Sequence, residues 1–137
     1  MKKGLVVFLS VAGVFGAIAF LFSGTYNGLV QAEEGVNQAW AQVENVYQRR
    51  LDLIPNLVET VKGYAAHEQS TLLAVTEARA KAAGQISADV VSNPDKFRMF
   101  QESQAALSSA LSRLLVTVEK YPDLKASQSF LSLQAQL

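Results

Sequence analysis

The chain contains no cysteine, one histidine and three prolines among 137 residues. Without cysteine it cannot form disulfides, thiolate metal sites or a cysteine nucleophile. A single histidine also excludes the paired imidazoles of a helical zinc peptidase. Basic and acidic residues balance at 12 each, so the basic excess typical of proteins that bind nucleic-acid phosphates is missing. The length accommodates one domain, and the composition offers little material for a catalytic centre.

What the sequence does have is a long apolar run at its start. Residues 4–22 carry no charge, and Ser10 is the only classically polar residue among them. As a helix this run is roughly 28 Å long, close to the ~30 Å hydrocarbon thickness of a bilayer. The pattern therefore predicts a transmembrane anchor over residues 1–24, with the lipid bilayer as its partner, and a helical domain over residues 25–137.

A cleaved secretory signal is the alternative interpretation of the same run. Its apolar region usually spans about 7–15 residues before a small-residue cleavage site. Here the run continues to Phe22, and cleavage after Ser23 or Gly24 would place bulky Leu21 or Phe22 three residues upstream. The small pair Ala17-x-Ala19 lies inside the apolar run. These features favour an uncleaved anchor.

Flanking charge predicts the orientation of this anchor. Lys2 and Lys3 precede the apolar run, and the next basic residue is Arg49. Because basic residues stay on the cytoplasmic side, the helical domain is expected to face away from the cytoplasm. Small residues at Ala12-x-x-x-Gly16 and Gly13-x-x-x-Ala17 would let two such helices approach closely, although short membrane spans are commonly rich in glycine and alanine.

Beyond Gly24 the apolar residues recur with a helical period of 3.5, interrupted at Arg50, Glu68 and Thr71. Such a seam is typical of a helical bundle and predicts one continuous helix over residues 31–83, on the order of 80 Å long. The two heptad positions are held by Val36, Val43, Leu57, Tyr64 and Ala78, and by Trp40, Tyr47, Ile54, Val61, Val75 and Ala82.

A second long helix is expected after a break over residues 84–93. Asn93-Pro94-Asp95 has the residues of a helix start: an N-cap, a first-turn proline and a first-turn acid. Its seam is interrupted by Gln104. A shorter helix is expected after Pro122, and nothing near Leu137 resembles a helix stop, so this C-terminal helix is expected to be incomplete. The fold class is thus an all-α antiparallel helical hairpin or bundle.

Two prolines generate a geometric hypothesis. Pro55 removes one backbone hydrogen bond and should kink the first helix near Leu51, whereas Pro122 should kink or end the second. In one long hairpin that turns near Ala88, both breaks would lie at the same height and residues 85–93 would form the distal tip.

Several motifs of this chain, in this order, resemble the LemA family. The most specific run is Arg49-Arg50-x-Asp52-Leu-Ile-Pro55-Asn56-Leu-Val. The resemblance implies a single-pass protein of the bacterial inner membrane with an extracytoplasmic helical domain and no established enzymatic activity; family chains continue past this point with a further helix. The other matching stretches are residues 26–30, Ala39-Trp40, residues 61–68 with Tyr64, His67 and Glu68, then Ala78-Arg79-Ala80, and residues 121–125 with Tyr121 and Pro122.

The candidate sites favour structure over catalysis. His67-Glu68 lacks the second histidine of a zinc site, so no metal is expected, and Glu68 should find a polar partner. Arg50 falls on the seam and must be paired or reach solvent. A contact that fixes helix register near Pro55 explains it better than partner docking. Ser108, Ser109 and Ser112 lack an activating base, and Trp40 with Tyr47 is expected in the core.

The sequence therefore predicts a non-enzymatic scaffold or adaptor of the cell envelope, without cofactors or an evident small-molecule substrate. If the last helix is incomplete, an uncovered apolar groove predicts a homo-oligomer or another helical membrane protein as partner. The alternatives left open are a component of an envelope hydrolase that uses His67 and nearby carboxylates, and a secreted helical protein after signal cleavage.

Overall fold

A computed structural model describes residues 2–137, apart from the side chains of Lys2, Lys3, Val6, Ser10 and Ala19. Every regular element in this range is a helix, which confirms the all-α fold class. The chain divides into two compact units, one that ends at Ala39 and one over Trp40–Leu137. The orientation prediction depends on the side chains of Lys2 and Lys3, which lie outside the described residues.

The first unit consists of the N-terminal part of helix α1 (Lys2–Tyr64). All of its described side chains are exposed, including Phe15, Phe20 and Phe22 at 69, 80 and 73%. In the part of the chain that the structure describes, α1 is the one helix long and apolar enough to cross a membrane, judged by length and composition. The apolar run is therefore helical, as predicted.

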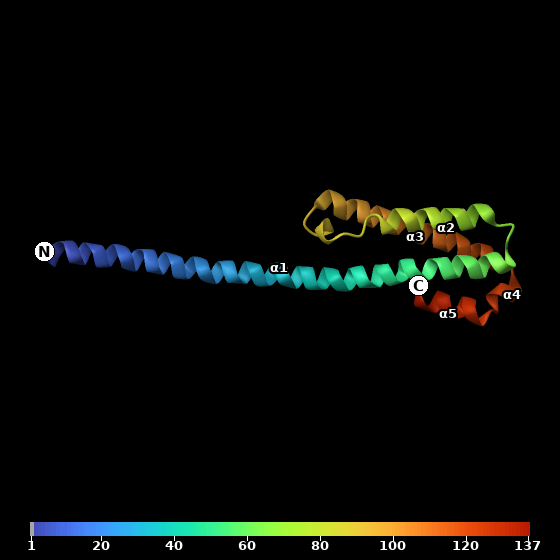
Figure 1. The fold of residues 1–137 in the computed structure, drawn as a ribbon, viewed down its shortest axis with the longest axis horizontal. Helices are drawn as coiled ribbons and strands as arrows, with labels where there is room; N and C mark the ends of the chain where they lie inside the picture. The colour runs from blue at the N-terminus through green and yellow to red at the C-terminus, as the bar shows by residue number, and fades with distance from the viewer. Residues whose placement is uncertain (1) are drawn as a thin grey trace. The chain divides into compact units, whose positions relative to one another are not determined.

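The second unit is a helical bundle around a continuous apolar core. The rest of α1 packs with the other elements shown in Figure 1, and the core includes Leu51, Ile54, Leu107, Leu114 and Phe130. These other elements are α2 (Gln69–Ala83), the 3₁₀ turn η1 (Ala88–Val90), α3 (Pro94–Val118), α4 (Pro122–Lys125) and α5 (Gln128–Gln136).

The prediction of one continuous helix over residues 31–83 is wrong. Helix α1 ends at Tyr64 and α2 begins at Gln69. The turn between them follows Gly63, a weak helix former, and it contains Glu68, one of the seam interruptions. Because the chain reverses here, Leu72 and Val75 join the shared apolar core. A straight helix would leave these two side chains in water.

The hypothesis that both prolines lie at the same height is also wrong. Pro55 lies inside α1, one turn after Leu51, whereas Pro122 begins α4 directly after Tyr121, whose hydroxyl contacts Glu68. Glu68 lies beyond the end of α1, thirteen residues after Pro55 and so on the order of 15–20 Å further along. The hairpin turns at residues 65–68 and not near Ala88, so the symmetry behind the hypothesis is absent.

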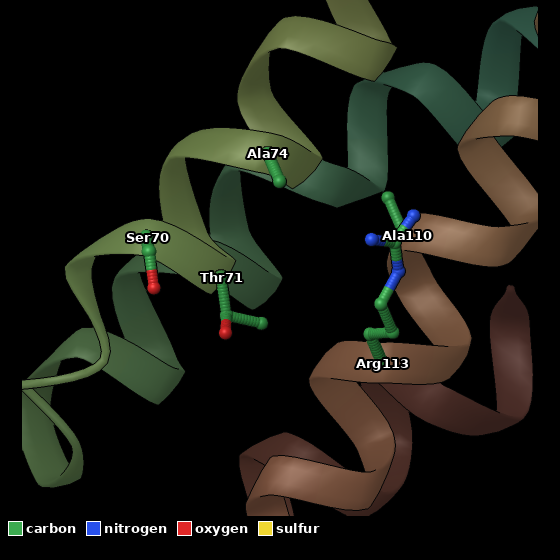
Figure 2. A pocket seen from close by; sticks show the side chains of 5 residues that line it. All are labelled: Ser70, Thr71, Ala74, Ala110 and Arg113. Atoms are coloured by element: carbon green, nitrogen blue, oxygen red, sulfur yellow. The ribbon is translucent and has the colours of Figure 1, made fainter.

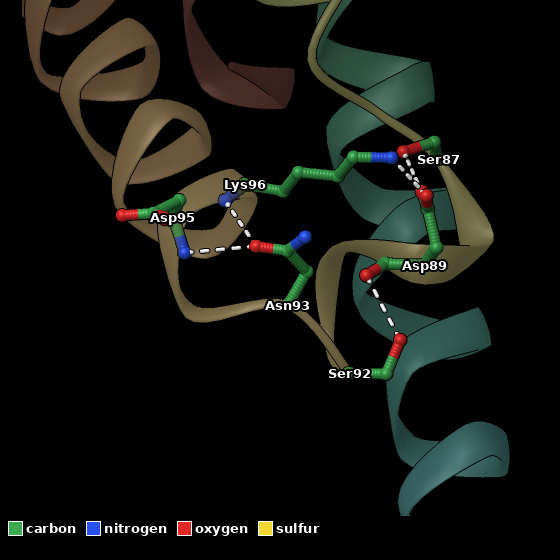
Figure 3. A network of polar contacts seen from close by, with 6 residues as sticks. All are labelled: Ser87, Asp89, Ser92, Asn93, Asp95 and Lys96. Carbon is green, nitrogen blue, oxygen red and sulfur yellow. Dashed lines mark hydrogen bonds and ion pairs between the residues drawn. The ribbon is translucent and has the colours of Figure 1, made fainter.

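The predicted start of the second long helix is confirmed. The Oδ1 atom of Asn93 accepts hydrogen bonds from the backbone N–H groups of Asp95 and Lys96 at 3.0 and 3.2 Å (Figure 3). This satisfies two of the orphan donors at the helix start. Pro94 occupies the first turn, where its missing N–H is harmless.

The loop before this helix lies at a different place from the one predicted. Its Val90 is buried with Trp40 and Phe100, so the loop packs at the end of the bundle where the chain enters from Ala39 and is no distal tip. Asp89 accepts hydrogen bonds from Lys96 Nζ and, at 2.6 Å, from Ser87 Oγ (Figure 3). These contacts, the Lys96 bond first, lower the pKa of the Asp89 carboxyl.

Candidate functional site

The backbone of α1 at Pro55 depends on an arginine from another helix. Because Pro55 has no N–H, the carbonyl of Leu51 has no helical donor. Arg79 Nε, on α2, donates to this carbonyl at 2.7 Å. Pro55 and Arg79, which both belong to the matching stretches, therefore act together. Pro55 leaves the Leu51 carbonyl without a helical donor, and Arg79 supplies one.

Arg49 and Arg50 both bind neutral side chains on other helices. Arg50 Nη2 donates to Ser108 Oγ on α3 at 3.2 Å, and Arg49 Nη2 donates to Gln136 Oε1 on α5 at 3.3 Å. The contacts join α1 to α3 and to α5; that Arg50 fixes the helix register stays a prediction. Asp52 instead accepts from Gln48 at 3.1 Å. Arg50 is half-buried, and its buried Nε has no hydrogen-bond partner among the described residues.

The turn at the end of α1 brings three further motif residues together. Tyr121 donates its hydroxyl proton to Glu68 Oε1 at 3.2 Å, and Pro122 starts α4 beside it. Burial first, and then the adjacent Glu68 carboxylate, raise the pKa of Tyr121. Glu68 thus has the polar partner that the sequence predicted. His67 is exposed, and the carboxylate next to it in sequence is occupied by Tyr121.

The other end of the bundle is an aromatic cluster. Trp40 is 9% exposed, and its ring meets Phe100 edge-on at 5.2 Å between centroids. Tyr47 meets Phe100 in the same way at 5.0 Å. This confirms the expectation that Trp40 and Tyr47 belong to the core, because edge-to-face pairs of this kind stabilise packing.

The remaining motif residues do not converge on a site. Asn56 is exposed, and its backbone carbonyl accepts from Thr60 Oγ1 at 2.8 Å. Tyr64, the last residue of α1, is 50% exposed. Within the described range, no three His, Cys, Asp or Glu side chains are grouped so that they could hold a metal ion.

A shallow pocket of about 200 Å³ lies between α2 and α3. Figure 2 shows Ser70, Thr71 and Ala74 on α2 facing Ala110 and Arg113 on α3. Arg113 is engaged by its own helix, because its Nη2 donates to Ser109 Oγ at 3.3 Å. The lining contains no base that could activate the hydroxyls of Ser70 and Thr71.

Sequence reasoning missed the partners of the two arginines, Ser108 and Gln136. Both lie more than fifty positions from their arginine, and no local pattern signals such a pairing. Gln104, the predicted seam exception, is 7% exposed. Its side-chain nitrogen and oxygen have no hydrogen-bond partner among the described residues, so it is a polar group within the apolar interior.

The sequence was compared with family models and with curated proteins. A family model described as "LemA family" matches residues 39–137. A curated relative, "Protein LemA" from Metamycoplasma hominis, is 25% identical over 133 residues, which cover 97% of this chain and 56% of the relative. The chain thus spans about half the length of that curated relative.

Proposed function

The chain belongs to the LemA family, and on that basis we propose that it is a membrane-anchored helical scaffold or adaptor of the bacterial cell envelope. It acts through helix–helix assembly, with itself or with another helical membrane protein, and not as an enzyme. The anchor sets its location, and the bundle over Trp40–Leu137 supplies the surfaces that partners contact.

The exposed apolar side chains of the first unit carry this proposal. Phe8, Phe15, Phe20 and Phe22 are between 69 and 80% exposed, and each gains about 1.5–3 kcal/mol on leaving water. The described part of the chain buries none of them, so a bilayer is the solvent that accounts for them. With Lys2 and Lys3 on the cytoplasmic side, the bundle faces the extracytoplasmic space of the inner membrane.

Extraction and labelling of the full chain in a bacterial host test this proposal. We expect the protein to stay in the membrane pellet after alkaline carbonate washing, with residue 1 or 2 at its N-terminus. Because the chain has no cysteine, the exposed Gln101→Cys provides a unique label. A membrane-impermeant maleimide should react with it in spheroplasts before lysis.

Three results would contradict the proposal. Release of the protein by carbonate would exclude the anchor. A mature N-terminus after residue 23 or 24 would support the secreted alternative. Reaction of the maleimide only after lysis would place the bundle in the cytoplasm.

A further inference from the structure

The segment between α2 and α3, residues 84–93, covers one side of the aromatic cluster at Trp40. We call this segment the strap. Its Val90, together with two half-buried neighbours, packs against Trp40 and Phe100. Among residues 84–93, all of which the structure describes, Val90 alone is buried, at 1% exposure. The apolar hold of the strap on the cluster therefore depends mainly on a single side chain.

The polar side-chain contacts of the strap are exposed to water. Asp89 forms an ion pair with Lys96 on α3 and accepts a hydrogen bond from Ser87 Oγ at 2.6 Å (Figure 3). The side chains of Asp89 and Lys96 are 53 and 46% exposed. The Ser87 bond lies within the strap, whereas the Lys96 pair joins the strap to α3. Because water and salt compete with an exposed ion pair, this pair holds the strap only weakly.

The indole N–H of Trp40 lies under this cover without an acceptor. It is buried, and it has no hydrogen-bond partner among the described residues. A donor in this state has given up its hydrogen bond to water and gained none in return, so it favours any form of the protein in which water reaches it. The burial of Val90 favours the covered form instead. Two opposed effects thus meet at one weakly held segment, and such segments open more readily than a core.

We propose that the strap is a cover that opens while the rest of the bundle stays folded, and that its opening admits water to Trp40. In the closed form Val90 is buried and the pair of Asp89 with Lys96 holds the strap to α3. In the open form the indole N–H of Trp40 is hydrated and Phe100 loses part of its cover. This inference goes beyond the proposed function, because it concerns a motion of the bundle that does not depend on a partner.

Hydrogen exchange of the Trp40 indole N–H, followed by NMR on the isotope-labelled full chain in micelles, tests this proposal. The sequence contains one tryptophan, so its indole signal is unambiguous. Because this N–H has no hydrogen-bond partner among the described residues, its exchange reports solvent access. We expect a protection factor above about ten, yet at least about a hundredfold below that of the backbone N–H of Leu114 in the core. Low urea concentrations should leave it unchanged, because local opening exposes little surface.

Two variants of the strap contacts should speed this exchange. Val90→Ala removes most of the buried apolar contact and should lower the indole protection factor about tenfold. Lys96→Gln removes the ion pair with Asp89 and should lower it about two- to fivefold. The matched control is Lys62→Gln, which removes another exposed ion pair, on α1. This control should leave the protection factor unchanged.

Four results would overturn the proposal. Exchange as fast as in free tryptophan would mean that the strap does not cover the indole. Protection that equals that of the Leu114 N–H and falls with it in urea would mean that only global unfolding admits water. An unchanged rate in a Lys96→Gln variant that circular dichroism shows to be folded would contradict the closing contact, and an equal effect of Lys62→Gln would assign the change to the whole bundle. Carbonate extraction tests the membrane anchor separately, so either proposal can fail alone.

Discussion

Two stretches of the same helix have opposite surroundings. Up to Ala39 the described side chains of α1 are exposed, with Leu9 at 60%, whereas beyond Trp40 the helix buries Leu51 and Ile54 at 1 and 0%. Both stretches are rich in apolar residues, and both form helix. Helix formation is local, but burial requires partners. The second stretch obtains them from α2, α3 and α5, and the first obtains none within the described residues.

A leucine-to-alanine substitution in the bundle core and one in the first stretch of α1 test this difference in burial most directly. Leu114→Ala removes a fully buried side chain of the bundle and should lower its free energy of unfolding by about 2–5 kcal/mol. Leu9→Ala should change it by less than about 0.5 kcal/mol. Urea unfolding of the micelle-bound protein, followed by circular dichroism, measures both. Similar losses would mean that the first stretch also packs against the bundle.

The second stretch of α1 receives a hydrogen bond from another helix, because Arg79 Nε on α2 donates to the Leu51 carbonyl. Arg79→Met leaves a carbonyl without a donor and should cost about 1–3 kcal/mol of unfolding free energy. Pro55→Ala restores an N–H at position 55. In the Pro55→Ala variant, Arg79→Met should therefore lower the unfolding free energy by less than half as much as in the wild type. A double-mutant cycle measures this difference.

Arg113→Met is the control for this cycle. It removes an exposed arginine whose side chain, among the described residues, donates to Ser109 on its own helix. Its effect should therefore be the same with either residue at position 55. Additive effects of Arg79→Met and Pro55→Ala would show that the arginine acts elsewhere.

The hydroxyl of Tyr121 donates a hydrogen bond to Glu68, in the turn that follows α1. Since the pKa of Tyr121 is raised above 10.0, the neutral phenol stabilises the fold. That contribution is present below pH 10 and is lost as pH rises through the raised pKa. Tyr121→Phe should lower Tm modestly at neutral pH, and it should reduce the loss of stability as the pH rises above 10.0. Tyr64→Phe, at an exposed phenol, is the control, and identical pH profiles for both variants would contradict the contact.

The smallest effect on stability is expected for Asp89, in the loop beside Trp40. The lowered pKa of Asp89 means that its carboxylate stabilises the fold above pH 3.8 and that this contribution is lost as pH falls through the lowered pKa. The ion pair with Lys96 is about half exposed, so the effect is small and screened by salt. Asp89→Asn should flatten the decline of Tm below about pH 4, and the exposed Asp123→Asn should not.

Some features could be predicted because their cause is local. Asn93-Pro94-Asp95 satisfies its own helix start, and the missing N–H of Pro55 identifies the carbonyl that needs a donor. The turn at residues 65–68 could not be placed, because the heptad spacing of apolar residues resumes after the interruption at Glu68. Only the burial of Leu72 and Val75 in the shared core makes the reversal favourable. The partners of Arg49 and Arg50 come from helices that pack beside α1 only after that reversal.

The sequence by itself determined the helical class, the apolar first segment, the start of α3 and the membership of the family, since each depends on the order of neighbouring residues. Only the tertiary structure decided that Arg79 would complete the backbone at Pro55, that Tyr121 would bind Glu68, and that Arg49 and Arg50 would contact side chains on two other helices. The reason is physical: a distant side chain can donate to an acceptor only after the intervening chain has folded back, and the position of that fold depends on the burial of the whole core.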